Sequence, residues 1–264
     1  MDYQDIIYEE KGGIATMTLN RPDKMNAFST GMRESMYRVV EHISQDKRVR
    51  VLIITGAGRA FCSGADVQTL AGNANRPTNQ ERPAEMGSER LSVHVLMQKC
   101  QKPIIAAING VAAGAGLDLA MACDIRIASD KARFAELYIR RGIFPVEGGI
   151  YLLPRLVGVG RACELIWTGD MIDATEAASI GLVSRVVPHE ELEIATKELA
   201  EKLAKAAPLA IQRSKQAIYS GLNMDFESSM KYIQPLMREI LQSKDHKEGT
   251  QAFLEKREPV FRGE

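Results

Sequence analysis

Hydrophobic positions in the first fifth of the chain predict a strand, a helix and a second strand. Residues 14–20 (IATMTLN) alternate between apolar and polar side chains, as a half-buried strand does. Ser29 suits a helix N-cap. After it, apolar side chains recur at helical spacing: Met32, Met36, Val39, Val40 and Ile43. Residues 49–55 (VRVLIIT) are mostly apolar, which is typical of a strand buried on both faces.

Strands and helices continue to alternate through the middle of the chain. Residues 104–109 (IIAAIN) predict a buried strand, residues 117–122 a helix, and residues 124–129 (DIRIAS) an alternating strand. A helix is expected over residues 89–100. Residues 71–88 are polar and rich in Asn, Pro and Gly, which is typical of a surface loop. This order predicts an α/β fold.

Helical patterns dominate from about residue 152 to the C-terminus. One short strand is expected near residues 184–187. Helices are expected over five ranges: 161–167, 175–179, 190–206, 208–219 and 226–242. The C-terminal third is therefore predicted to be a helical layer. Its packing partner, either its own core or a neighbouring subunit, stays open.

Charge balance and the absence of known signals exclude several classes of protein. The 264 residues carry 34 Lys and Arg against 34 Asp and Glu, whereas nucleic-acid binders carry a basic surplus. No apolar run approaches the length of a membrane span, and from its polar, acidic composition we expect the N-terminal segment not to be a signal or transit peptide. The four Cys and four His are scattered without zinc spacing. We expect a cytoplasmic protein with no metal and no nucleic-acid or membrane partner.

One glycine-rich segment has the features of an anion-stabilising site. Residues 110–116 (GVAAGAG) lie between a predicted strand and a predicted helix, where small residues let a ligand approach free N–H groups. Such a helix start suits an oxyanion hole. Asp118 lies three residues after Ala115 and therefore on the same helix face. Asp118 is either a catalytic carboxylate or a first-turn acid favoured by the helix dipole.

Two further segments offer groups for catalysis. Residues 60–67 (AFCSGADV) follow a buried strand and can supply a second N–H donor, with Asp66 as an acid or a cap. Cys62 and Ser63 are discounted as nucleophiles, because no His stands in a recognisable relation to either. Glu147 lies among Pro, Val and two Gly, where an unpaired charge is costly. Burial would raise its pKa toward that of a general acid or base, and the alternative is a solvated loop glutamate.

Seven segments carry a family resemblance through their order and spacing: residues 20–27, 54–66, 102–110, 118–126, 153–158, 168–170 and 177–183. On these motifs the chain resembles the crotonase, or enoyl-CoA hydratase/isomerase, superfamily over nearly its whole length. The resemblance implies a crotonase-type spiral of ββα units with a CoA site over residues 1–200. A subunit-contacting helical region is expected over residues 201–264. The resemblance also implies a homotrimer or hexamer, an acyl-CoA thioester substrate, and no cofactor beyond the CoA of that substrate.

The same resemblance assigns roles to individual residues. The two oxyanion donors fall on the backbone N–H groups of Ala65 and Ala115, in the two loops selected above on physical grounds. Paired donors would stabilise the thioester enolate in the transition state. Ten residues are implied to bind the substrate or its CoA: Lys24, Met25, Ala27, Arg59, Cys62, Ser63, Gly64, Asp66, Gly114 and Tyr138.

The catalytic carboxylates depart from the best-known hydratases, which carry two glutamates. The first falls on Asp118, which is one methylene shorter, and the second on Tyr138, which is no carboxylate base. Glu136 would substitute only if the local backbone shifts. We expect Glu147 to be the acid/base, assisted by Asp118 and with Tyr138 as a hydrogen-bonding partner. Glu147 lies one position later than the acid of several isomerases in the family.

The leading hypothesis is an enoyl-CoA hydratase that adds water across the 2,3 double bond of a 2-enoyl-CoA. The close alternative is isomerisation of 3-enoyl-CoA to 2-enoyl-CoA, which needs a single carboxylate. Two other classes are a non-catalytic relative that binds acyl-CoA or RNA, and a hydrolase that uses Ser63 or Cys62. The acyl-chain length and the pathway stay open.

Overall fold

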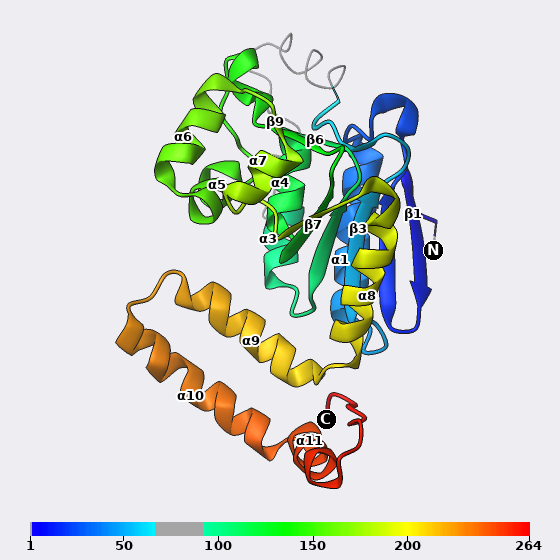
Figure 1. Cartoon of the computed structure of the whole chain (residues 1–264), viewed down its shortest axis with the longest axis vertical. Coiled ribbons are helices and arrows are strands. Elements are labelled where there is room, and N and C mark those ends of the chain that lie inside the picture. Colours follow the sequence, from blue (N-terminus) through cyan, green and yellow to red (C-terminus); the bar gives the residue numbers. More distant parts are fainter. Residues whose placement is uncertain (1, 67–91) are drawn as a thin grey trace, which may run out of the picture.

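Two β-sheets form the centre of the molecule, whose computed structural model describes residues 2–66 and 92–264 (Figure 1). The larger sheet has six strands, of which β1 and β2 are antiparallel and the others parallel. In sheet order they are β1 (Ile6–Lys11), β2 (Ile14–Leu19), β3 (Val51–Gly56), β5 (Ile104–Ile108), β7 (Ile125–Ser129) and β10 (Arg185–Val187). The smaller sheet consists of β4 (Ala60–Cys62), β6 (Val111–Ala113), β8 (Arg133–Ala135) and β9 (Ile172–Asp173).

A repeated pair of strands links the two sheets. β3, β5 and β7 are neighbours in the larger sheet, and each leads through a short turn into β4, β6 or β8 of the smaller one. These three short strands are parallel, with Val111 opposite both Ala60 and Arg133, and the pairing of β4 with β6 has an irregularity between Ala60 and Cys62. Their carboxyl ends therefore lie at one edge of the smaller sheet. This arrangement confirms the predicted α/β spiral of ββα units.

Helices cover both faces of the larger sheet. α1 (Thr30–Gln45) begins at the predicted N-cap Ser29, whose hydroxyl accepts the N–H of Met32 at 3.0 Å. All five apolar positions predicted for this helix are buried in the main core, which α3 (Val93–Lys99) and α4 (Ala115–Ala122) share. α8 (Leu192–Lys205) packs on the opposite face against strands β3, β5 and β7.

The remaining helices form two groups, which Figure 1 shows at opposite ends of the sheet. Beside the smaller sheet lie η2 (Leu137–Arg141), α5 (Gly149–Val157), α6 (Val159–Thr168) and α7 (Ala174–Ser179). At the other end, α9 (Pro208–Gly221), α10 (Phe226–Gln242) and α11 (Lys244–Glu255) stand away from the main body. Two short 3₁₀ turns complete the order, η1 (Pro22–Lys24) and η3 (His189–Glu191).

A buried lysine joins the projecting helices to the core. The ammonium of Lys215 on α9 donates to Oδ2 of Asp124 at 2.8 Å and to the carbonyl of Lys102 at 3.0 Å. Tyr219 donates to the other oxygen of Asp124 at 2.7 Å. The division predicted at residue 200 stays a prediction, and α8 runs through it. Within residues 2–66 and 92–264, no helix is both long and apolar enough to span a bilayer.

Candidate active site

The loops after β4, β6 and β8 bring the predicted site residues together. An ideal Cβ on Gly64 would lie 2.8 Å from the carbonyl oxygen of Ala113 and 3.4 Å from the nitrogen of Ala115. Gly64 also has φ +100°, so only glycine allows the two loops this approach. Gly114, the N-cap of α4, donates its N–H to the carbonyl of Ala135 at 2.8 Å, which joins the second loop to the third.

The backbone amides of Ala65 and Ala115 lie in the two loops that Gly64 brings together. Ala65 forms a parallel bridge with Phe28, in which the flanking Gly64 carbonyl and Asp66 N–H bond to Phe28. The N–H of the central residue then points to the other side, away from Phe28. Ala115 is the first residue of α4, where N–H groups have no intrahelical acceptor and the helix dipole is positive.

Asp118 lies in the first turn of α4 and is completely buried. Its Oδ2 accepts the hydroxyl of Tyr138 at 2.6 Å, so Tyr138 is the hydrogen-bonding partner that the sequence predicted. Burial raises the pKa of Asp118 to about 7, opposed by the hydrogen bond from Tyr138 and reinforced by the negative charge of Glu147. A carboxyl group with a pKa near 7 can both give and take a proton at neutral pH.

Glu147 lies in the loop before α5 and is held by a cation from α1. Arg33 bonds both of its carboxylate oxygens, at 2.6 and 2.9 Å, while the guanidinium stacks over the ring of Phe28 at 4.8 Å. Burial alone would raise the pKa of Glu147, but the hydrogen bonds and charge of Arg33 outweigh it and hold the pKa below its usual range. The raised pKa expected from the sequence is therefore wrong in direction.

Two residues of this site were missed by sequence reasoning, which treated the histidines as packing or surface residues and did not consider Arg33. His94 is buried on α3, with its Nδ1 3.5 Å from Oε2 of Glu147. Burial lowers the pKa of His94 to about 4, so the ring is neutral at neutral pH. The one signal in the sequence was Glu147 itself, since a charge in an apolar turn requires a partner.

Glu136, which the sequence analysis considered only as a conditional substitute, directly follows β8. Its side chain is completely buried beside Asp118. Burial, followed by the charge of Asp118 and a hydrogen bond to it, raises the pKa of Glu136 to about 10.

The other predicted binding residues lie around the first of the three loops. The side chains of Lys24 and Arg59 are exposed, and Met25 is half-buried. The N–H of Ser63 donates to the carbonyl of Met25 at 3.0 Å, which joins the loop after β4 to the turn that follows η1. Ala27 and Gly64 are buried, Ser63 and Asp66 are half-buried, and Gly114 lies against the ring of Tyr138.

The surroundings of Cys62 and Asp66 bear on whether Cys62 can act as a nucleophile and whether the charge of Asp66 is paired. Cys62 is fully buried, and burial raises the pKa of its thiol to about 12, which removes it as a nucleophile at neutral pH. Asp66 pairs with Arg21 at 3.0 Å, so its charge is already matched by a cation.

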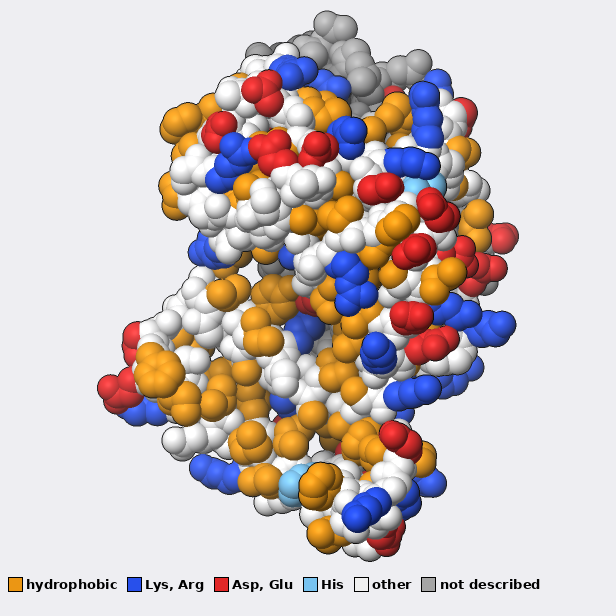
Figure 2. Space-filling model, in the orientation of Figure 1, with side chains coloured by type: hydrophobic (Ala, Val, Ile, Leu, Met, Phe, Trp, Pro, Cys, Tyr) orange, Lys and Arg blue, Asp and Glu red, His pale blue; other side chains and the backbone are white. Residues whose placement is uncertain are grey.

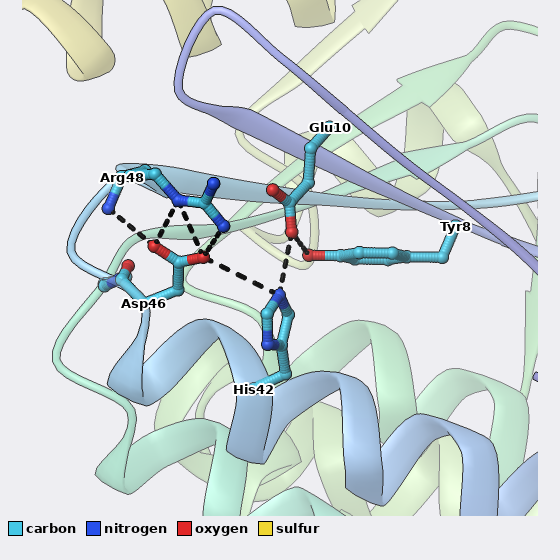
Figure 3. A network of polar contacts seen from close by, with 6 residues as sticks. Tyr8, Glu10, His42, Asp46 and Arg48 are labelled. Atoms are coloured by element: carbon cyan, nitrogen blue, oxygen red, sulfur yellow. Dashed lines mark hydrogen bonds and ion pairs between the residues drawn. The ribbon is translucent and has the colours of Figure 1, made fainter. Parts of the chain in front are cut away.

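One cluster elsewhere has the composition of a metal site. Within the described part of the chain, one set of three His, Cys, Asp or Glu residues has its potential ligand atoms within 4.8 Å of one another (Figure 3). It consists of Glu10, His42 and Asp46. Nε2 of His42 lies 2.9 Å from Glu10, which also accepts the hydroxyl of Tyr8 at 2.6 Å. Arg48 bonds both oxygens of Asp46. These groups satisfy one another, and the network holds β1 against α1.

Comparisons with known proteins give a consistent result. Residues 9–264 match the family model described as enoyl-CoA hydratase/isomerase. The chain is 38% identical to a short-chain-enoyl-CoA hydratase of Clostridium acetobutylicum over 258 residues, or 97% of each chain. It is also 38% identical to a crotonyl-CoA hydratase of Syntrophomonas wolfei over 262 residues, or 99% of each. The crystal structure of an enoyl-CoA hydratase from Bacillus anthracis superposes with a TM-score of 0.89 at 36% identity, covering 99% of this chain and 100% of that one.

Proposed function

Because the chain belongs to the enoyl-CoA hydratase/isomerase family, we propose that it is an enoyl-CoA hydratase, which adds water across the 2,3 double bond of a 2-enoyl-CoA thioester. The observation that carries this proposal is a pair of carboxyl groups with opposite pKa shifts, Asp118 and Glu147, close to the two adjoining loops that carry the amides of Ala65 and Ala115. Relatives named hydratases, matched over nearly the whole chain, favour hydration over double-bond isomerisation.

The amides of Ala65 and Ala115 bind the thioester oxygen. When water adds to C3, the π electrons move toward this oxygen and form an enolate. Two preformed N–H donors stabilise the growing negative charge more than they stabilise the neutral thioester, so they lower the barrier. The positive end of α4 acts in the same direction.

The two carboxyl groups divide the proton transfers. Glu147, kept charged by Arg33, orients the water and takes one of its protons as the oxygen bonds to C3. Asp118, whose pKa is about 7, gives a proton to C2 as the enolate collapses. One water is thus consumed, with its hydroxyl on C3 and the equivalent of its second proton on C2. Proton exchange returns Glu147 and Asp118 to their starting states.

The loop after β4 and the turn after η1 bind the CoA part. Ser63 and Gly64 directly precede Ala65, the N–H of Ser63 bonds the carbonyl of Met25, and Phe28, which follows Ala27, pairs with Ala65. Lys24 and Arg59 are exposed nearby along the chain, where cations suit the phosphates of CoA. This assignment follows the chemistry of the substrate and needs no cofactor beyond the CoA that the substrate carries.

The projecting helices form the contact between subunits of a homotrimer or hexamer. Large apolar side chains are exposed along them: Ile218, Leu222, Phe226, Met237, Leu241, Phe253 and Leu254. Figure 2 shows apolar side chains gathered over this part of the molecule. An exposed apolar surface of this kind is typical of an interface.

Light scattering should give a mass several times that of one chain, and Phe226→Glu or Phe253→Glu should lower it. A single-chain mass for the unmodified protein contradicts this assignment.

Paired assays test the reaction itself. The purified protein is given 2-enoyl-CoA and 3-enoyl-CoA thioesters of several chain lengths, and products are identified by mass. We expect the 2-enoyl substrate to gain one water, and Glu147→Gln to abolish the gain. Mass-neutral conversion of the 3-enoyl substrate without hydration would show an isomerase. Recovery of both substrates unconverted would contradict both reactions.

A further inference from the structure

Three buried carboxyl oxygens beside the reacting groups have no hydrogen-bond donor. They are Oε1 and Oε2 of Glu136 and Oδ1 of Asp118, and apart from the other carboxyl group of this pair no donor in the described part of the chain bonds any of them. Both residues are completely buried. An ionised carboxylate in such a place would lose its hydration without compensation, which is among the most costly arrangements in a protein.

The two side chains face the same small space next to α5. An ideal Cβ on Gly149 would collide with Oδ1 of Asp118 and would lie 2.9 Å from Oε1 of Glu136. Two negative charges in this space would repel each other strongly. One proton shared between the two carboxyl groups removes that repulsion and gives each a hydrogen-bond partner.

We propose that Glu136 keeps its proton at neutral pH and donates it as a hydrogen bond to Oδ1 of Asp118, and that Glu136 is thereby a positioning residue for the proton transfer to C2. Once Asp118 has given its own proton to C2, its carboxylate accepts one hydrogen bond at each oxygen, from Glu136 and from Tyr138. Both donors stabilise the carboxylate that remains after Asp118 has given up its proton. The catalytic part of this inference rests on the proposed hydratase function, whereas the shared proton does not.

The charged groups around the pair support this protonation state. Tyr138 on η2 donates to Asp118, and Glu147 adds negative charge from the loop before α5. Arg33 on α1 is committed to Glu147, and neutral His94 on α3 lies against the same residue. No cation therefore bonds directly to Glu136 or Asp118 in the described structure. Burial and the charge of Asp118 raise the pKa of Glu136 to about 10.

Infrared spectroscopy of the unliganded protein tests the shared proton without any assay. At pH 8.5, above the pKa of about 7 for Asp118, we expect a C=O band of a protonated carboxyl group. The band should disappear in Glu136→Gln. In Asp118→Asn it should titrate at lower pH, because the negative neighbour is gone. The absence of the band in the unmodified protein, or its persistence in Glu136→Gln, would overturn the proposal.

The pH dependence of hydration tests the positioning role. Glu136→Gln keeps a neutral donor, so kcat/KM at pH 7 should stay within about threefold of the unmodified enzyme, a small effect for an intact acid/base. Glu136→Leu keeps about the same side-chain volume but removes the hydrogen-bond donor to Asp118, so the pKa of Asp118 should rise. The limb of the kcat/KM profile that reports Asp118 should then move to higher pH by about one unit. An unmoved limb in Glu136→Leu contradicts positioning. If no variant hydrates 2-enoyl-CoA but the infrared band behaves as expected, the hydratase assignment has failed and the shared proton stands.

Discussion

Arg33 and Glu147, 114 positions apart in the sequence, form a two-pronged ion pair with contacts of 2.6 and 2.9 Å in the candidate site. The pair joins α1, which packs on the larger sheet, to the loop that precedes α5. It decides the charge of Glu147, because burial alone would favour the neutral acid. A residue of α1 can thus set the protonation state of the carboxyl group that we propose as an acid/base.

Replacing Arg33 should weaken catalysis through Glu147. In Arg33→Met the carboxylate loses its partner, so its pKa should rise and kcat should fall by about ten- to a hundredfold, part of what an acid/base contributes. The acid limb of the pH profile should move to higher pH. Arg33→Lys keeps the charge but loses the two-point hydrogen bonding, so its kcat should lie between those of the unmodified enzyme and Arg33→Met. An acid limb that stays in place in Arg33→Met would show that Glu147 does not need this cation.

Asp118→Asn separates the two reactions of the family. Hydration as proposed uses both carboxyl groups, so the variant should lose about a hundredfold or more in kcat, the usual contribution of an acid/base. An isomerase that shuttles its proton on Glu147 would tolerate the change. Asp225→Asn, at the exposed N-cap of α10, is the matched control, because asparagine also caps helices well. Equal activity of the two variants would remove Asp118 from the mechanism.

Tyr138→Phe should change the pH dependence more than the maximal rate. The hydroxyl that donates to Asp118 at 2.6 Å is lost, and a hydrogen bond to a charged group contributes about 1.5–3 kcal/mol. The pKa of Asp118 should therefore rise above about 7 by one to two units. Tyr151→Phe is the control, since its hydroxyl bonds Asn223 on the surface of the molecule. Profiles of kcat/KM against pH for both variants give the answer, and coinciding profiles would argue against this hydrogen bond.

The elements that the sequence revealed are those with long periodic patterns. α1 shows its buried side directly in Met32, Met36 and Val39, and β3 and β5 appear as continuous apolar runs. The three-residue strands β4, β6 and β8 are too short for any period, so the smaller sheet stayed hidden. α5 carries Pro154 in its interior and starts at Gly149, both signals of a loop. β1 and α11 were also not predicted, and the loop expected at 71–88 lies outside the described residues.

For the site, local chemistry was predictable and long-range pairing was not. A helix start rich in small residues pointed to Ala115 and Asp118, because free N–H groups follow from the helix itself. The partners of Glu147 come from α1 and α3, and no local pattern reports such a contact. Glu136 was set aside because residue spacing was compared with a family motif, whereas the end of β8 brings its side chain to Asp118 directly.

The buried acids should make the protein less stable as pH rises. The pKa values of Asp118 and Glu136 are raised to about 7 and about 10, so the folded state keeps protons that the unfolded chain releases above about pH 4 to 4.5. Their contribution to the free energy of unfolding is complete below that pH and is lost as pH rises through the folded values. One such group changes the free energy of unfolding by up to about 1.4 kcal/mol per pH unit, and Glu136→Gln removes that change. Urea unfolding at pH 5, 7 and 9 should show a flatter dependence for the variant, and parallel curves would contradict it.

Gly149 and Gly160 form a matched pair of helical glycines. A Cβ at Gly149 would collide with Asp118 and press on Glu136 and Pro145, whereas one at Gly160 would meet nothing within 4 Å. Gly149→Ala should therefore cost about 1–3 kcal/mol in unfolding free energy and displace Asp118, with a large loss of kcat. Gly160→Ala should stabilise by up to about 1 kcal/mol through helix propensity alone, with unchanged activity. Chemical unfolding and kcat of both variants test this, and a Gly149→Ala enzyme of normal stability and rate would show that the carboxyl groups do not fill the space beside that residue.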